Sequence, residues 1–109
     1  MDLVEQCYKL TAKFPRDEVF GLTAQIRRAS VSIAANIAEG YGRETTGSFI
    51  QFLRVAQGSV KELETHWMIA DRVGLVTEGE TASLLKTCES LGKMMRNLIR
   101  ALERKSEGS

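Results

Sequence analysis

The sequence contains little proline, few aromatic residues and no long apolar run. One proline and seven aromatic residues among 109 argue against a sandwich or barrel built from many short strands. No stretch approaches the roughly 18 consecutive apolar residues that a membrane-spanning helix requires. The first residues, Met1 to Glu5, are acidic where a signal peptide would be basic. We therefore expect no membrane association, no secretion and a cytoplasmic location.

Cysteine and histidine are also scarce. Two cysteines, Cys7 and Cys88, make neither a disulfide framework nor a zinc site, so we expect two reduced thiols in the core. Four-helix bundles that bind two metal ions use Glu-x-x-His pairs, and His66 with its neighbours Glu62 and Glu64 does not form one. His66 is expected to flank the core near Glu62, one helical turn away. The sequence predicts no metal site and no cofactor.

The total charge and the number of reactive side chains exclude few functions by themselves. Fifteen basic and fourteen acidic residues give a formal charge of +1, so any charged partner must be recognised by a local distribution. Serines and threonines are plentiful, but none is paired with a base in a pattern typical of acyl, phosphoryl or glycosyl transfer. We expect no catalytic site and no enzymatic activity.

Four segments repeat apolar residues with the three- and four-residue steps of an amphipathic helix. Pro15 ends the first because proline lacks an amide hydrogen and clashes with the preceding turn. Gly40 and Gly74 are candidate caps at the ends of the second and third. Thr45 and Thr77 are expected to cap the starts of the third and fourth. The expected helices are residues 2–14, 20–39, 46–73 and 78–105, with a frayed tail at 106–109.

The short connections between these segments make sequential helices antiparallel neighbours. Sustained spacing of this kind also favours packing at shallow crossing angles. The predicted fold class is therefore all-α, a single antiparallel up-down four-helix bundle over residues 1–109. Its expected core is formed by Leu3, Cys7, Leu10 and Phe14, by Leu22, Ile26, Ala29, Ile33 and Ile37, by Phe49, Leu53, Ala56, Val60, Leu63, Trp67 and Ala70, and by Leu84, Cys88, Leu91, Met95, Leu98 and Leu102.

The expected helices differ in length. The first spans roughly 20 Å and the last two roughly 40 Å each, so the first covers only one end of the long hairpin. Apolar side chains at the other end should then lack partners within one chain, and such surfaces usually meet another subunit. The side chains concerned are Met95, Leu98, Ile99 and Leu102. The oligomer contact is assigned to a second apolar shoulder of the fourth helix, Leu85, Gly92 and Ile99.

Basic residues gather on the face of the fourth helix opposite its apolar stripe. One interpretation is a solvated face that complements the negative end of the helix dipole. The other is a strip that binds phosphates. The residues of this face are Lys93, Arg96, Arg100 and Arg104. Secondary candidates are Arg27 and Arg28, with Arg54 expected near them, and Arg43.

The glycine-rich segment Gly40 to Arg43 lacks the features of a dinucleotide loop or a P-loop. It is best interpreted as a turn between helices, although the amides that begin the next helix could accept an anion. Asn36 and Glu39, just before it, are expected to join a hydrogen-bond network at the helix end.

Several stretches resemble a known family. Phe20 to Ala29, Val31 to Arg43 and Phe49 to Leu53, with Glu62 to Thr65, are similar to the 23S rRNA intervening-sequence protein family, also called four helix bundle proteins. The resemblance implies a bacterial protein without known enzymatic activity. Members look like accessory proteins of diversity-generating retroelements, which form homopentameric barrels and bind nucleic acid and a reverse transcriptase. The resemblance therefore implies a homopentamer and these classes of partner.

Together these observations favour a non-enzymatic homo-oligomer, expected to be a pentamer, that binds structured RNA or DNA through its basic surface. The alternative is a protein-interaction scaffold whose partner is another polypeptide, with little or no nucleic-acid binding. A continuous belt of unpaired bases favours the first function. Scattered bases held in salt bridges favour the second.

Overall fold

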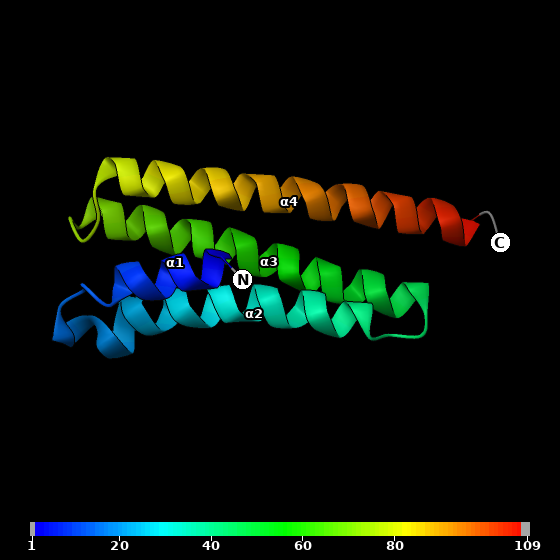
Figure 1. Ribbon diagram of the computed structural model, residues 1–109, viewed down its shortest axis with the longest axis horizontal. Helices are drawn as coiled ribbons and strands as arrows, with labels where there is room; N and C mark the ends of the chain where they lie inside the picture. Colours follow the sequence, from blue (N-terminus) through cyan, green and yellow to red (C-terminus); the bar gives the residue numbers. More distant parts are fainter. Residues whose placement is uncertain (1, 108–109) are drawn as a thin grey trace.

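The computed structural model describes residues 2–107, and this range contains helices and turns but no strand. The main helices are α1 (Asp2–Thr11), α2 (Ala24–Tyr41), α3 (Thr46–Arg72) and α4 (Glu78–Glu107). A 3-10 turn (Arg16–Glu18) and a π-helical turn (Val19–Thr23) lie between α1 and α2. The helices run along the long axis of a molecule that measures 52 × 23 × 18 Å, each antiparallel to the next (Figure 1). The predicted four-helix bundle is confirmed.

The connection between α1 and α2 begins earlier than the periodicity predicts. Regular α1 ends at Thr11 because the chain then tightens, with the amide of Phe14 donating to the carbonyl of Thr11 at 3.0 Å. The residue before a proline avoids the helical conformation, which accounts for the break ahead of Pro15. Gly21 also departs from helical geometry, so regular α2 begins at Ala24 and not at residue 20.

Two other helix ends differ from expectation. Helix α2 continues to Tyr41 and is capped by Gly42, so Gly40 is not its cap. Gly40 is buried inside the helix, where it allows close packing against Phe49 of α3. Helix α4 continues to Glu107, so the first half of the expected frayed tail is helical. Residues 108 and 109 lie outside the described range.

The predicted caps at the other ends are confirmed. The hydroxyl of Thr45 accepts a hydrogen bond from the amide of Ser48 at the start of α3. Thr77 and Glu80 form a reciprocal capping box at the start of α4, with bonds of 2.9 and 3.0 Å. Gly74, with φ of +80°, ends α3 in the left-handed conformation that glycine adopts most readily.

A single hydrophobic core runs through all four helices. Trp67 is fully buried at the α1 end of the bundle. The ring of Phe14 packs edge to face against it, with ring centroids 6.1 Å apart. Cys7 and Cys88 are buried free thiols, as expected. The core is formed by Leu3, Cys7, Phe14, Ile26, Ala29, Ile33, Leu53, Ala56, Val60, Leu63, Trp67, Ala70, Leu84, Cys88, Met95 and Ile99.

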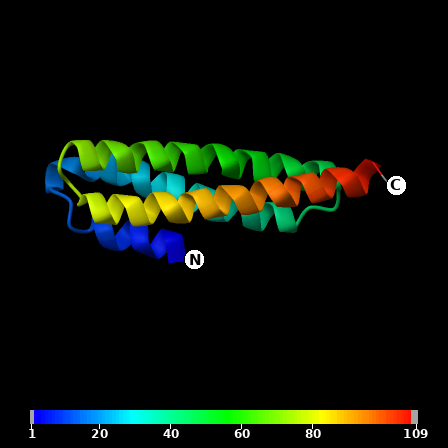
Figure 2. The same ribbon diagram turned by 90° about the horizontal axis from the view of Figure 1, so that it is seen from above.

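Helix α1 lies alongside only one half of the bundle, as its length predicts (Figures 1 and 2). In the other half α4 lies over α2 and α3 (Figure 2). Met95 and Ile99 are nevertheless buried there, so the expectation that they lack partners within the chain is wrong. Leu98 and Leu102 remain partly exposed at the edge of this core.

The second apolar shoulder of α4 faces α3 of the same chain. Ile99, only 4% exposed, borders a hollow together with Gln57 of α3. Leu85 borders another with Met68 of α3. The assignment of Ile99 to an uncovered oligomer contact is therefore corrected, because helical periodicity turns this shoulder toward α3. Gly92, between the two, lies beneath the guanidinium of Arg96.

Candidate nucleic-acid interface

The basic face of α4 is exposed along its whole length. Lys93 and Arg104 mark its ends, and the eleven helical steps from one to the other span about 16 Å. The face lies opposite core residues such as Met95, so its side chains point to solvent. Among the side chains that the structure describes, no carboxylate forms an ion pair with any of its four bases. We call these four residues the α4 strip: Lys93, Arg96, Arg100 and Arg104.

Arg54 of α3 extends the α4 strip across the groove between the two helices. Arg54, Arg96 and Arg100 border one shallow hollow of about 290 Å³. Glu103 also borders it, and its carboxylate lies 3.1 Å from the guanidinium of Arg54. The acidic residue beside the strip is therefore already neutralised by a base on α3.

This position of Arg54 differs from the sequence-based expectation, which placed it near Arg27. The hydroxyls of Ser32 and Ser59 meet at 2.8 Å and fix the register of α2 against α3. In this antiparallel register Arg54 lies level with a residue about ten positions after Arg27, roughly 15 Å away along the axis. The expectation was wrong because the register cannot be read from either helix alone.

The remaining basic candidates are used differently. Arg43 pairs with Glu39 one turn before it, and its guanidinium lies 4.7 Å over the ring of Phe52. Arg27 bonds to the hydroxyl of Thr11 at the opposite end of the molecule. Arg28 is exposed on α2. None of these three borders the hollow that Arg54 shares with the α4 strip.

The glycine-rich segment at the end of α2 has a structural role. Tyr41 packs on Phe49 with ring centroids 4.8 Å apart, and Gly40 gives Phe49 the room to approach. The first amides of α3 have no partner within the helix, and that of Ser48 donates a hydrogen bond to the hydroxyl of Thr45. This geometry supports the interpretation as a turn between helices.

Polar side chains inside the bundle also form local networks. Asn36 donates to the carbonyl and the hydroxyl of Ser32, at 2.8 and 3.2 Å. His66 lies 3.5 Å from the carboxylate of Glu62, the neighbour predicted for it. The Asn36 bonds lie within α2 and the His66 contact lies within α3, so these groups are used locally along their own helices.

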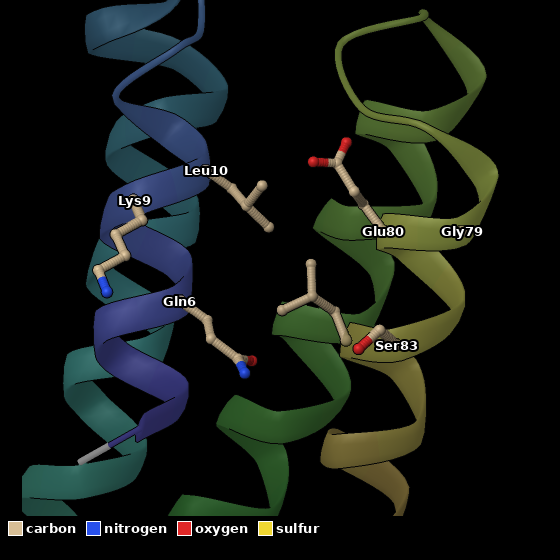
Figure 3. Close-up of a pocket in the computed structure, with 7 residues that line it drawn as sticks. Gln6, Lys9, Leu10, Gly79, Glu80 and Ser83 are labelled. Carbon is tan, nitrogen blue, oxygen red and sulfur yellow. The ribbon is translucent and has the colours of Figure 1, made fainter.

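A separate hollow of about 450 Å³ lies between α1 and α4. Figure 3 shows Leu10 pointing from α1 toward α4, with Gln6 beside it and Glu80 on the facing helix. Backbone hydrogen bonding to Thr77 lowers the pKa of Glu80, because the capping bond favours the ionised carboxylate. That carboxylate is committed to the cap, so it is not free to act as an acid or a base in this hollow.

The thiols are the other reactive groups of the core. Burial raises the pKa of Cys7 to about 11 and that of Cys88 to about 12, since desolvation disfavours the thiolate. Both are therefore protonated and unreactive at neutral pH.

Within the described range, His, Cys, Asp and Glu do not gather in any group of three or more able to hold a metal ion. None of its helices is both long and apolar enough to span a bilayer.

Sequence reasoning missed two residues of this surface, Gln57 and Glu103. Neither residue belongs to a local sequence motif, because each borders this hollow only once α3 and α4 are packed together. Glu103 could be seen as a charge on the basic face of α4, but its partner Arg54 is 49 residues away.

Comparison with known proteins agrees with the resemblance found in the sequence. A family model described as 23S rRNA-intervening sequence protein matches residues 1–97. A solved structure, of a protein of unknown function from the S23 ribosomal protein family of Bacteroides thetaiotaomicron, is 24% identical and superposes with a TM-score of 0.78. That match covers 88% of this chain and 87% of the other and confirms the fold. No curated protein matches the chain.

Proposed function

The chain belongs to the 23S rRNA-intervening sequence protein family, and from this premise we propose that it is a non-enzymatic, homo-oligomeric bundle that binds structured RNA or DNA. The contact surface is the α4 strip together with Arg54. The protein recognises the phosphate backbone and does not read the base sequence.

One observation carries this proposal. The α4 strip is exposed, and its bases have no acidic partner among the described side chains. Arg43 and Arg54 are held in ion pairs, whereas the α4 strip segregates four unpaired bases on one face of a single helix. Segregation of this kind attracts a polyanion even though the chain as a whole is nearly neutral.

The dimensions of the strip suit a nucleic-acid backbone. Its length of about 16 Å corresponds to roughly five phosphates of one strand at 3.4 Å each. Arginine and lysine side chains that point outward from one helix can reach phosphates without entering a groove. Affinity should therefore depend strongly on salt and little on sequence.

Assembly into an oligomer would repeat the strip and strengthen this attraction. Support comes from an apolar seam in the half of the bundle that α1 does not cover. Met94 is 51% exposed there, and Leu98 and Leu102 are partly exposed. An apolar surface of this type on a folded chain commonly meets another subunit. The family resemblance favours a pentamer.

Titration of fluorescently labelled duplex RNA and DNA tests the proposal. We expect a log–log salt slope near −4 to −5 for duplex DNA, with similar affinities for unrelated sequences. Arg96→Glu with Arg100→Glu should abolish binding, since both side chains are exposed and the fold should survive. Lys9→Glu with Arg72→Glu makes the same change in charge on exposed residues of α1 and α3 and should retain most of the affinity. An equal loss of affinity in both double variants would show that the α4 strip is not the contact surface.

A protein-interaction scaffold remains the second candidate, and a specific surface favours it. Val55, Ile69 and Val73 are exposed along the outer side of α3. If the wild-type chain fails to bind either nucleic acid at low salt, the scaffold function is preferred. Binding of a polypeptide that is lost on Ile69→Asp, with nucleic-acid binding absent, would establish it.

A further inference from the structure

A second hollow lies at the end of the molecule opposite the α4 strip. It has a volume of about 480 Å³ and opens between the end of α1 and the start of α2. This size is within the range of roughly 300–1,000 Å³ that is usual for small-molecule sites. Its lining includes Thr11, Phe14, Arg16, Phe20, Thr23 and Arg27.

Arg27 is held in place before any ligand arrives. Its Nε donates to Thr11 Oγ1 at 2.8 Å and its Nη2 to the carbonyl of Tyr8 at 3.4 Å. The guanidinium also lies 4.5 Å over the ring of Tyr8. Thr11 Oγ1 donates its own proton to the carbonyl of Cys7 at 2.6 Å, which leaves its lone pairs for Arg27. A guanidinium has five N–H donors, so these contacts leave several of them unused.

Phe20 is the most exposed large apolar side chain among the described residues, at 96%. Burial therefore contributes almost nothing to keeping a phenylalanine at this position. The ring sits on the π-helical turn Val19–Thr23, in which Gly21 leaves helical geometry. Single π-helical turns occur frequently at functional sites. The turn thus presents an aromatic ring to solvent beside a fixed arginine.

Three further features complete the hollow. Arg16 is exposed and supplies a second cation. Thr23 is only 5% exposed, and its hydroxyl has no hydrogen-bond partner within the described residues. Asp17 and Glu18 are close in sequence, but neither forms an ion pair with a described base. The two guanidinium groups therefore remain available to an anion.

We propose that this hollow binds one nucleotide unit, with the base stacked on Phe20 and the phosphate held by Arg16 and Arg27. A flat aromatic ring joined to a phosphate matches an exposed aromatic side chain next to two arginines. Guanidinium groups bind phosphate through paired hydrogen bonds, and bases stack on aromatic side chains without sequence preference. The unit has two sources, a free mononucleotide or the phosphorylated end of a single strand. The site is separate from the α4 strip and does not depend on the function proposed for it.

Equilibrium dialysis of the full chain at low salt tests the proposal with adenosine 5′-monophosphate as the probe. We expect saturable binding, with adenosine and inorganic phosphate each at least about tenfold weaker because each lacks one half of the unit. A single-stranded oligoadenylate with and without a 5′-phosphate distinguishes the sources. Preference for the phosphorylated strand over the mononucleotide, lost on Phe20→Ala, assigns the site to a strand end.

Variants locate the site. Phe20→Ala should weaken binding about tenfold, and Phe20→Tyr should retain it because the ring is kept. Arg16→Ala should also weaken binding. Tyr41→Ala removes an exposed aromatic ring at the other end of α2 and is the matched control, with no change expected. Circular dichroism checks that each variant is folded. Absence of saturation by both the mononucleotide and the 5′-phosphorylated strand, or binding unchanged by Phe20→Ala, would overturn the assignment.

Discussion

Arg54 on α3 donates a hydrogen bond of 3.1 Å to the carboxylate of Glu103 on α4, across 49 residues of sequence. This pair connects the C-terminal half of α4 to α3 beyond the reach of α1. It also neutralises the acid that lies beside Arg96 and Arg100. This contact therefore determines whether the guanidinium of Arg54 is free to bind an anion.

Glu103→Gln should raise the affinity for duplex nucleic acid, because it removes a negative charge and releases Arg54 to bind phosphate. The log–log salt slope should become steeper by about 1. Stability should change by less than about 1 kcal/mol, since both partners are about half exposed. Glu62→Gln removes the same charge from an exposed pair elsewhere on α3 and is the control for a general charge effect. Unchanged affinity in Glu103→Gln would show that Arg54 has no part in binding.

Two glycines inside helices should respond oppositely to alanine. At Gly40 an added Cβ would lie 2.9 Å from Phe49 Cδ1 and 3.3 Å from Phe52 Cβ. Overpacking of this type costs about 1–3 kcal/mol and should outweigh the gain of about 1 kcal/mol in helix propensity. At Gly58 no atom lies within 4 Å of an added Cβ, so alanine should stabilise α3 by about 0.5–1 kcal/mol. Urea denaturation measures both, and a stabilised Gly40→Ala would contradict the packing described for Tyr41 and Phe49.

The burial of Ile99 changes how the proposed oligomer must be tested. Ile99→Asp should unfold or severely destabilise the chain, by about 3 kcal/mol or more, because it places an unpaired charge in the core. Met94→Asp should instead dissociate the oligomer with helicity unchanged, since Met94 is half exposed on the apolar seam. Sedimentation equilibrium with circular dichroism separates the two effects. A wild-type chain that is monomeric at micromolar concentration would remove the oligomer from the proposal.

Alkaline pH should destabilise the protein through its two thiols. Burial raises the pKa of Cys7 and Cys88 above the ordinary value of 9.0, to about 11 and about 12. Below pH 9 both thiols are protonated in the folded and unfolded states, and their contribution is constant. As pH rises above that value, the unfolded chain releases these protons while the folded chain retains them. The free energy of unfolding therefore falls, by up to about 1.4 kcal/mol per pH unit for each thiol.

Denaturant midpoints measured at neutral pH and near about pH 10 check this expectation. Cys88→Ala should lose less stability over the interval than the wild type, because one of the two protons is no longer involved. A polar thiol reagent should label the native chain slowly at neutral pH and the denatured chain rapidly. Rapid labelling of the native chain would contradict the buried positions of Cys7 and Cys88.

The sequence alone predicted the four helices and about half of their ends. Thr45, Thr77 and Gly74 act at the ends expected for them, because capping and left-handed turns depend only on a few adjacent residues. The core stripe was also predicted, since the 3.6-residue period of a helix fixes which residues share a face. The resemblance to the family rests on the same local sequence.

Only the tertiary structure decided which surfaces are covered and which charges are free. Ile99 is buried and Leu98 partly exposed because α4 turns one shoulder toward α3, and the period of α4 cannot say where α3 lies. The pairing of Arg54 with Glu103 depends on the register of distant helices, as does the unpaired state of Arg96. The exposure of Phe20 was also decided by the tertiary structure, because the path of the π-helical turn between α1 and α2 leaves its ring in solvent. Periodicity is a property of one helix, whereas burial and ion pairing are relations between helices that meet only in the folded chain.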